Sequence, residues 1–101
     1  MNSVYEIDTL EQFQQVLEYP NLIVYKIYSN SCGPCVAYKP QFEEFAKKTS
    51  TNVIFITSDV SKNFIKVHAL PTTIFIKNKQ IIDKIVGLDM PLLEQKVAQY
   101  A

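Results

Sequence analysis

Two cysteines separated by two residues are the most reactive feature of this sequence. The stretch Cys32-Gly33-Pro34-Cys35 contains both cysteines of the 101-residue chain. Side chains at positions i and i+3 share one face of a helix and can approach closely enough to form a disulfide. A disulfide that closes so short a loop constrains little of the unfolded chain, because its stabilising effect grows with the loop. The pair is therefore interpreted as a reactive dithiol.

The two residues between the cysteines indicate that Cys32 lies at the start of a helix. Gly33 lets the backbone turn into the helix without a side-chain clash, and Pro34 suits the first turn, where its missing N–H costs nothing. Unpaired N–H groups and the positive end of the helix dipole stabilise a thiolate there. Cys35, one turn further on, is expected to be shielded and able to resolve a mixed disulfide. The spacing predicts thiol–disulfide exchange.

Other uses of a Cys-x-x-Cys pair stay open but are disfavoured. A structural zinc site takes four Cys or His ligands, and the remaining candidates are His68 and scattered carboxylates, so no metal is expected. His68 itself is interpreted as a surface histidine. An inert buried pair is unlike a helix start with Gly-Pro between the cysteines. A metal or cluster shared by two chains is compatible with the sequence.

Charge and hydropathy exclude several classes of partner. Ten Lys and Arg balance ten Asp and Glu, so no net field favours nucleic acid or an anionic membrane. The N-terminus lacks the pattern of a signal peptide, and the apolar window 22–28 is too short to span a bilayer. We expect a cytoplasmic monomer with one domain over residues 1–101.

Hydrophobic periodicity predicts alternating strands and helices. Thr9 and Gln12 form a possible capping box for the first helix, and Pro40 should kink the second. The order predicts an α/β fold with a mixed central sheet, about five strands and about four helices. A right-handed crossover places Cys32 at the carboxyl end of a central strand, where open α/β sheets place their sites. The expected strands are 4–7, 22–28, 53–56, 72–77 and 80–86, and the expected helices are 10–17, 35–48, 64–67 and 91–100.

At this point the residues resemble the thioredoxin family over nearly the whole chain. The family's Trp-Cys-Gly-Pro-Cys appears here as residues 31–35, and its kinking helix proline matches Pro40. Its Ile-Pro-Thr resembles Leu70-Pro71-Thr72, and its strand-Lys-Asn-turn-strand-Gly segment matches residues 76–87. Gly-Pro between the cysteines is the thioredoxin choice, whereas glutaredoxins usually carry Pro-Tyr and disulfide isomerases Gly-His.

The resemblance implies the thioredoxin fold and a role for each matched residue. Cys32 would be the nucleophile and Cys35 the resolving thiol of a redox-active disulfide. Pro71 would be cis, and the backbone of Leu70 would pair with the substrate. The resemblance also implies protein disulfides as substrates, an NADPH-linked thioredoxin reductase as partner, and no bound cofactor. The residues expected to contact substrate are Ser31, Gly33, Pro34, Leu70, Pro71 and Gly87.

Three residues depart from the family pattern. Lys26 stands where the family has a buried aspartate, Thr57 where a lysine often pairs with it, and Ser31 where a tryptophan precedes the first cysteine. Lys26 is either an ammonium that modulates the thiol pKa values or a snorkelling residue whose stem packs on the core. Snorkelling is favoured, because an unpaired buried charge is costly.

Three functions fit these residues. The leading hypothesis is a general reductant of protein disulfides. A specialist electron donor to one enzyme, such as a ribonucleotide reductase, fits the altered Ser31 and Lys26. A binding module with secondary redox activity is the third, and the intact Cys-Gly-Pro-Cys weighs against it, because a scaffold has no need of both thiols.

Overall fold

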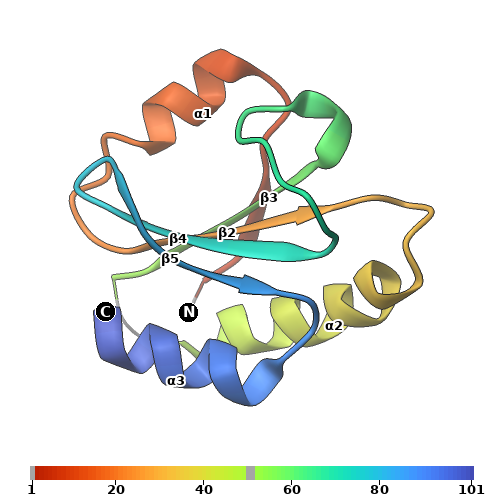
Figure 1. Cartoon of the computed structure of the whole chain (residues 1–101). Helices are drawn as coiled ribbons and strands as arrows, with labels where there is room; N and C mark the ends of the chain where they lie inside the picture. The colour runs from red at the N-terminus through yellow and green to blue at the C-terminus, as the bar shows by residue number, and fades with distance from the viewer. Residues whose placement is uncertain (1, 50–51) are drawn as a thin grey trace.

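A five-stranded sheet forms the centre of the computed structural model, which describes residues 2–49 and 52–101 (Figure 1). The strand order is β1-β3-β2-β4-β5, with β1, β3 and β2 parallel and β4 and β5 antiparallel to their neighbours. The predicted mixed sheet is therefore confirmed. The strands are β1 (Val4–Glu6), β2 (Ile23–Tyr28), β3 (Ile54–Asp59), β4 (Thr72–Lys77) and β5 (Gln80–Val86).

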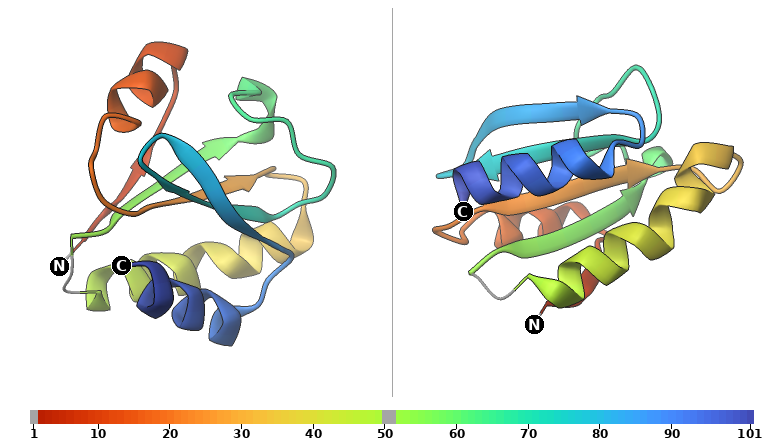
Figure 2. Two further views of the ribbon diagram at one scale, coloured as in Figure 1. Left: turned by 60° about the vertical axis from the view of Figure 1, so that its left-hand side comes forward. Right: turned by 90° about the horizontal axis from the view of Figure 1, so that it is seen from below.

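Helices cover both faces of the sheet. α1 (Leu10–Val16) lies on one face, and α2 (Gly33–Lys48) and α3 (Met90–Tyr100) lie side by side on the other (Figures 1 and 2). The capping box predicted from Thr9 and Gln12 is present at the start of α1. These two layers of helix bury the sheet from both sides, which explains why the sequence of β2 is an almost continuous apolar run.

One predicted helix is wrong. Residues 64–67 were expected to be helical, but the structure has only a 3₁₀ turn, η1 (Val60–Lys62), before them. Asp59 caps this turn through Ser61, and Asn63 ends it in the left-handed region at φ 56°. The apolar residues Phe64, Ile65 and Val67 then pack on the core from an irregular segment. These apolar residues have helix-like spacing because only one side of the irregular segment packs against the core.

Two apolar clusters lie on either side of the sheet. The cluster under α2 and α3 includes Tyr38, Phe42 and Phe55, whose rings meet edge to face at centroid distances of 5.3 and 5.6 Å. The cluster under α1 includes Phe13 and Tyr25. Strand β2 contributes to both clusters and therefore holds its carboxyl end, where the cysteine loop begins, in a fixed place.

The β4–β5 hairpin turns through Asn78 and Lys79, at φ 54° and 65°. Positive φ at both central residues matches the right-handed twist of the flanking strands, so the turn predicted from sequence is confirmed. The hairpin makes β5 an edge strand of the sheet.

Candidate redox-active site

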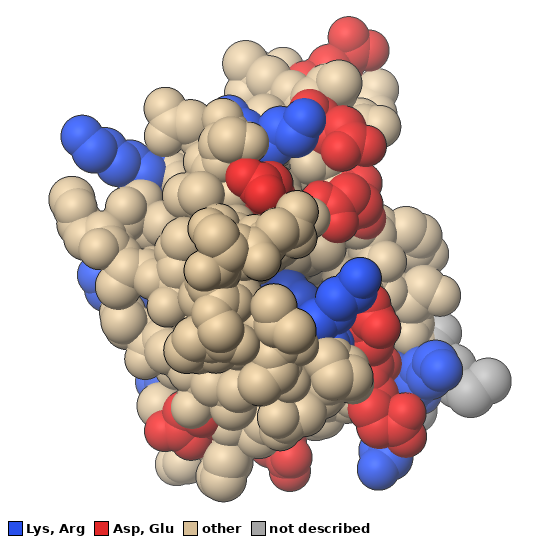
Figure 3. Space-filling model, turned by 90° about the vertical axis from the view of Figure 1, so that its right-hand side faces the viewer, with Lys and Arg blue, Asp and Glu red and all other residues tan. Residues whose placement is uncertain are grey.

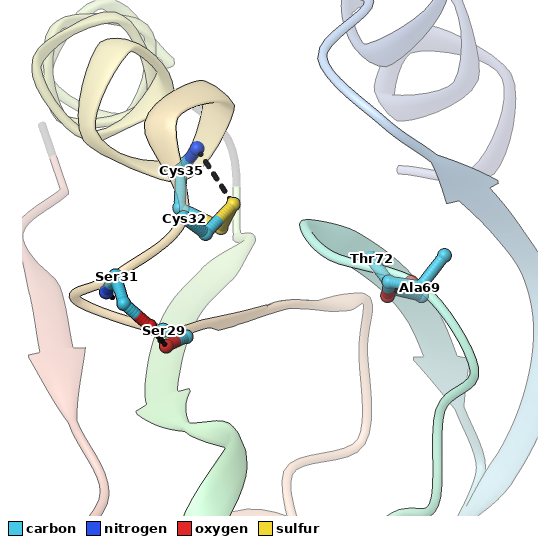
Figure 4. Close-up of a disulfide and its surroundings, with 6 residues drawn as sticks. All are labelled: Ser29, Ser31, Cys32, Cys35, Ala69 and Thr72. Carbon is cyan, nitrogen blue, oxygen red and sulfur yellow. Dashed lines mark hydrogen bonds between the residues drawn. A yellow bond between two sulfur atoms is a disulfide. The ribbon is translucent and has the colours of Figure 1, made fainter.

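The cysteine pair lies where β2 leads into α2. Cys32 is the N-cap of α2, and its Sγ accepts a hydrogen bond from the backbone N–H of Cys35 at 3.2 Å (Figure 4). The loop before it is closed by the Cys32 N–H, which donates to the Ser29 carbonyl at 3.2 Å. Pro34 occupies the first turn, as its fixed φ favours. The sulfur of Cys32 therefore sits at the N–H groups of a helix start, as the sequence predicted.

Cys32 and Cys35 form a disulfide, with 5.2 Å between their Cα atoms. Their exposure differs: Cys35 is 3% exposed, whereas Cys32 is only half-buried. Gly33, Pro34 and Val36 around them are exposed. An incoming molecule can therefore reach Cys32 far more easily than Cys35.

The turn before β4 faces the disulfide from the other side of the site. The Leu70–Pro71 peptide bond is cis, as the family resemblance implied. Thr72 Oγ1 donates to the Ala69 carbonyl at 2.6 Å, and both residues lie across from the cysteines in Figure 4. The Gly87 N–H, at the end of β5, donates to the Pro71 carbonyl at 2.8 Å. The residues expected to contact substrate thus come from three separate segments, and on the side of the cis-proline Leu70 and Gly87 are half-buried and Pro71 is buried.

Lys26 is the unusual residue of the site. It is 3% exposed, and its Nζ lies 4.9 Å from the ring centroid of Phe42, 5.5 Å from that of Tyr38 and 5.7 Å from that of Tyr28. Such contacts stabilise a cation against the ring faces. Burial lowers the pKa of Lys26 from 10.5 to about 8, although the Glu43 carboxylate opposes that shift. The snorkelling interpretation, in which the ammonium reaches bulk water, does not fit this burial.

Lys26 and Cys35 line the same pocket, which has a volume of about 220 Å³. Thr57 lies beside Lys26 in the sheet register and donates its Oγ1 hydrogen to the Lys26 carbonyl at 2.8 Å. The two family positions that departed from the pattern are thus neighbours here, and they carry one ammonium and one hydroxyl. The other residues lining the pocket are Val4, Glu6, Tyr28, Ser29, Asn30, Val36, Lys39 and Glu43.

Acidic groups gather on one flank of the site. The Tyr28 hydroxyl donates to Glu6 at 2.8 Å, and burial together with that bond and the Asp59 and Asp8 charges raises the pKa of Tyr28 to about 12. Figure 3 shows the face at which α2 begins, with a largely uncharged area left of and below the centre, and with most of the acidic side chains, together with some basic ones, toward the right. Sequence reasoning missed this flank. The sequence does place acidic residues where the strands end: Glu6 at the end of β1 with Asp8 just past it, and Asp59 at the end of β3.

The described parts of the chain contain neither a metal-binding cluster nor a membrane-spanning helix. Over residues 2–49 and 52–101, no group of three or more His, Cys, Asp or Glu side chains is placed to hold a metal ion. Within the same ranges, no helix has the length and hydropathy needed to cross a membrane.

Comparisons with known proteins agree with this geometry. The family model described as Thioredoxin matches residues 4–99. The chain is 32% identical over 108 residues to thioredoxin H4-2 of Oryza sativa subsp. japonica. That match covers 98% of this chain and 81% of the rice thioredoxin. It is similar in structure to the thioredoxin Mala s 13 of Malassezia sympodialis, with a TM-score of 0.90 and 32% identity over 99% of this chain and 92% of that one.

The chain is also 30% identical over 104 residues to the peptide-N(4)-(N-acetyl-beta-glucosaminyl)asparagine amidase of Caenorhabditis elegans. That match covers 96% of this chain and 17% of the amidase.

The fold, the cysteine pair and these relatives together define a thiol–disulfide oxidoreductase. Its mixed sheet, its Cys-Gly-Pro-Cys helix start and the match of residues 4–99 to the family model agree on one assignment. The chain belongs to the thioredoxin family.

Proposed function

We propose that this protein is a general reductant of protein disulfides, with Cys32 as the nucleophile and Cys35 as the resolving thiol. The observation that carries the proposal is the unequal exposure of the two cysteines at the start of α2, with Cys32 half-buried and Cys35 3% exposed. A substrate disulfide can reach the sulfur of Cys32, whereas the sulfur of Cys35 is shielded from it.

In the proposed reaction the reduced protein gives two electrons to the substrate. The Cys32 thiolate attacks one substrate sulfur, forms a mixed disulfide and releases the other substrate sulfur as a thiolate that takes up a proton. Cys35 then loses its proton and attacks Cys32 Sγ, which forms the Cys32–Cys35 disulfide and releases the second substrate thiolate. Helix N–H groups near Cys32 favour the thiolate that begins the cycle.

Substrate contact is assigned to residues of three segments, of which Ser31, Gly33 and Pro34 are exposed, Leu70 and Gly87 half-buried and Pro71 buried. Ser31, Gly33 and Pro34 border the sulfur on one side. On the other side Leu70, Pro71 and Gly87 are held together by the hydrogen bond from Gly87 to Pro71. An extended substrate strand would pair with the Leu70 backbone there, and the largely uncharged area of this face suits partners of varied charge (Figure 3).

Lys26 is proposed to modulate the thiols. Its side chain and that of Cys35 border one pocket, so a positive charge on Nζ favours the thiolate of the resolving cysteine. The pair Lys26 and Thr57 offers no carboxylate at this position, so the proton of Cys35 must leave by another route than in relatives that carry an aspartate.

The remaining parts of the proposal concern partners and setting. An NADPH-linked reductase would return two electrons to the Cys32–Cys35 disulfide after each turnover. The protein would act as a monomer in a reducing compartment such as the cytoplasm, because a dithiol that donates electrons must be kept reduced.

Trapping of the mixed disulfide tests the assignment of roles. Cys35→Ser should accumulate a mixed disulfide between Cys32 and a substrate such as insulin, because the resolving thiol is absent. Cys32→Ser is the matched control and should trap far less. Equal trapping by both variants, or trapping by neither, would contradict the two-step mechanism.

A specialist donor is the second candidate, favoured by Ser31 and by the buried Lys26. Rates of reduction of insulin and of several unrelated disulfide peptides, driven by dithiothreitol, separate the two. A general reductant should reduce all of them at similar rates, whereas a specialist should reduce them all slowly.

A further inference from the structure

A second surface borders the site on the side of the cis-proline turn. Ile81, Lys84 and Val86 of β5 lie on the same sheet face as α1, because they pair with residues 76, 74 and 72 of β4. The apolar cluster under α1 includes Ile74 and Ile76 of β4 but no described residue of β5. This half of the sheet face is therefore open.

A groove of about 400 Å³ occupies this open half-face. Its volume lies within the roughly 300–1,000 Å³ of typical ligand clefts, so it can seat side chains of a partner. Ile81 and Val86 are 57% and 58% exposed within it, which is high for large aliphatic side chains on a sheet. We call it the basic groove, and the residues that line it are Ile65, Lys66, Val67, His68, Ala69, Thr72, Ile74, Ile81, Lys84 and Val86.

The charges at the basic groove have one sign. Lys66 and Lys84 are both exposed there, and none of the described residues that line it is acidic. Asp83, the neighbour of Lys84, is held on the opposite face by Lys96 and Tyr100. The groove therefore combines apolar residues with two lysines. The acidic residues Glu6, Asp8 and Asp59 belong to the β1 and β3 side of the sheet, across β2 from β4 and β5.

The basic groove is continuous with the proposed substrate edge. Ala69 and Thr72 belong to the groove and flank the cis Leu70–Pro71 bond. Val86 belongs to it and precedes Gly87, whose N–H donates to the Pro71 carbonyl. A polypeptide whose cysteine reacts at Cys32 can therefore continue past Pro71 directly into the groove.

We propose that the basic groove binds an acidic, apolar segment of the disulfide substrate, a few residues from its reactive cysteine. One or two aliphatic side chains of that segment cover Ile81 and Val86, and its carboxylates lie near Lys66 and Lys84. This inference rests on the proposed reduction of protein disulfides. It adds a preference among substrates that the reaction at Cys32 does not itself require.

Peptide substrates test the preference. Each peptide carries one cysteine, disulfide-linked to a thiol reporter, and an arm placed either before or after the cysteine. The arms are Leu with two Glu, Leu with two Lys, Ser with two Glu, and a neutral Ser-Gly arm. At low salt the wild-type protein should reduce the Leu-Glu peptide, in one of the two orientations, with a kcat/KM about fivefold above that of the neutral peptide. The advantage should shrink in 0.5 M salt.

Matched variants locate the effect. Lys66→Glu with Lys84→Glu should lose the preference for Glu arms and favour Lys arms, while the neutral peptide keeps its kcat/KM. Lys47→Glu with Lys48→Glu changes net charge equally but lies in the last turn of α2, at the far end from Cys32, and should retain the wild-type preference. Ile81→Ser should lower the rate for the Leu-Glu arm toward that for the Ser-Glu arm.

The outcomes separate the two proposals. If the neutral peptide is not reduced at all, the proposed function fails. If it is reduced but the Glu arms confer no advantage, or the control variant loses the advantage as well, the basic groove is not the docking site. A dimer in sedimentation analysis that Ile81→Ser converts to a monomer would also overturn the inference, because a second copy would then be the occupant.

Discussion

The hydroxyl of Tyr38 and the hydroxyl of Thr73 form a hydrogen bond of 2.8 Å in the core. Tyr38 lies one turn after Cys35 in α2, and Thr73 lies two residues after the cis Pro71 in β4. Both side chains are at most 1% exposed. This single bond therefore joins the helix that carries the cysteines to the strand that begins at the cis-proline.

Tyr38→Phe should destabilise the protein, because it leaves the Thr73 hydroxyl buried without its partner. An unpaired buried hydroxyl costs about 1–3 kcal/mol of unfolding free energy, and urea denaturation measures it. Thr73→Val should cost a similar amount. The double variant Tyr38→Phe with Thr73→Val should lose clearly less than the two single variants combined. Strict additivity would show that the two hydroxyls do not stabilise each other.

Cys32 should react faster than Cys35 with iodoacetamide in the reduced protein near neutral pH. The thiolate at Cys32 is favoured by the helix start, and its sulfur is reachable, whereas Cys35 is covered. Mass spectrometry of peptides after brief labelling measures the ratio, which we expect to exceed about tenfold. Preferential labelling of Cys35 would reverse the assigned roles.

Most of the fold could be predicted because its signals are local. The apolar run in β2 follows from burial on both faces, and the Asn78-Lys79 turn has the residues that positive φ favours. The absent helix at 64–67 shows the limit. The apolar residues do have helical spacing, but Asn63 adopts the left-handed conformation and ends the preceding turn. An asparagine in a sequence does not by itself show that it will adopt this conformation.

The site was predicted only where its residues are adjacent in the sequence. Cys32 and Cys35 were placed correctly by the Gly-Pro between them. The burial of Lys26 was not, because Nζ lies against rings from both β2 and α2, and only tertiary packing brings Tyr28 and Phe42 together around it. The basic groove also depends on which part of the sheet α1 leaves uncovered.

Asp83 should make the free energy of unfolding depend on pH under acidic conditions. Hydrogen bonds from Lys96 and Tyr100, each at 2.6 Å, lower the pKa of Asp83 to about 2. A carboxylate with a lowered pKa in the folded state contributes stability that is present above about pH 4 and is lost as pH falls toward 2. Asp83→Asn should therefore cost about 1 kcal/mol at pH 7 and flatten the loss between pH 4 and 2.

Urea denaturation at several pH values measures this profile. Glu94→Gln changes one carboxylate on the exposed side of α3 and serves as the control for net charge. A profile for Asp83→Asn parallel to that of the wild type would show that these contacts do not hold α3 on β5.

Lys26→Met should stabilise the folded protein near neutral pH. The pKa of about 8 means that burial opposes the ammonium, and the full shift from 10.5 corresponds to about 3 kcal/mol. Contacts with the aromatic rings offset part of this cost, so we expect Lys26→Met to gain about 1–2 kcal/mol of unfolding free energy at pH 7. A lysine with a lowered pKa destabilises fully below pH 8, and the penalty is lost between about pH 8 and 10.5. The advantage of Lys26→Met should therefore disappear over that range.

The same substitution tests whether Lys26 acts on the thiols. A positive Nζ beside the pocket shared with Cys35 lowers the thiol pKa values and stabilises the reduced form, which makes the disulfide easier to reduce. Lys26→Met should therefore raise the thiol pKa values and shift the reduction potential to a more negative value. Thiolate absorbance near 240 nm through a pH titration, and equilibration with glutathione, measure the two quantities. Lys39→Met removes an exposed cation from the same pocket and should change both less. Superimposable titrations of wild type and Lys26→Met would limit Lys26 to a structural role.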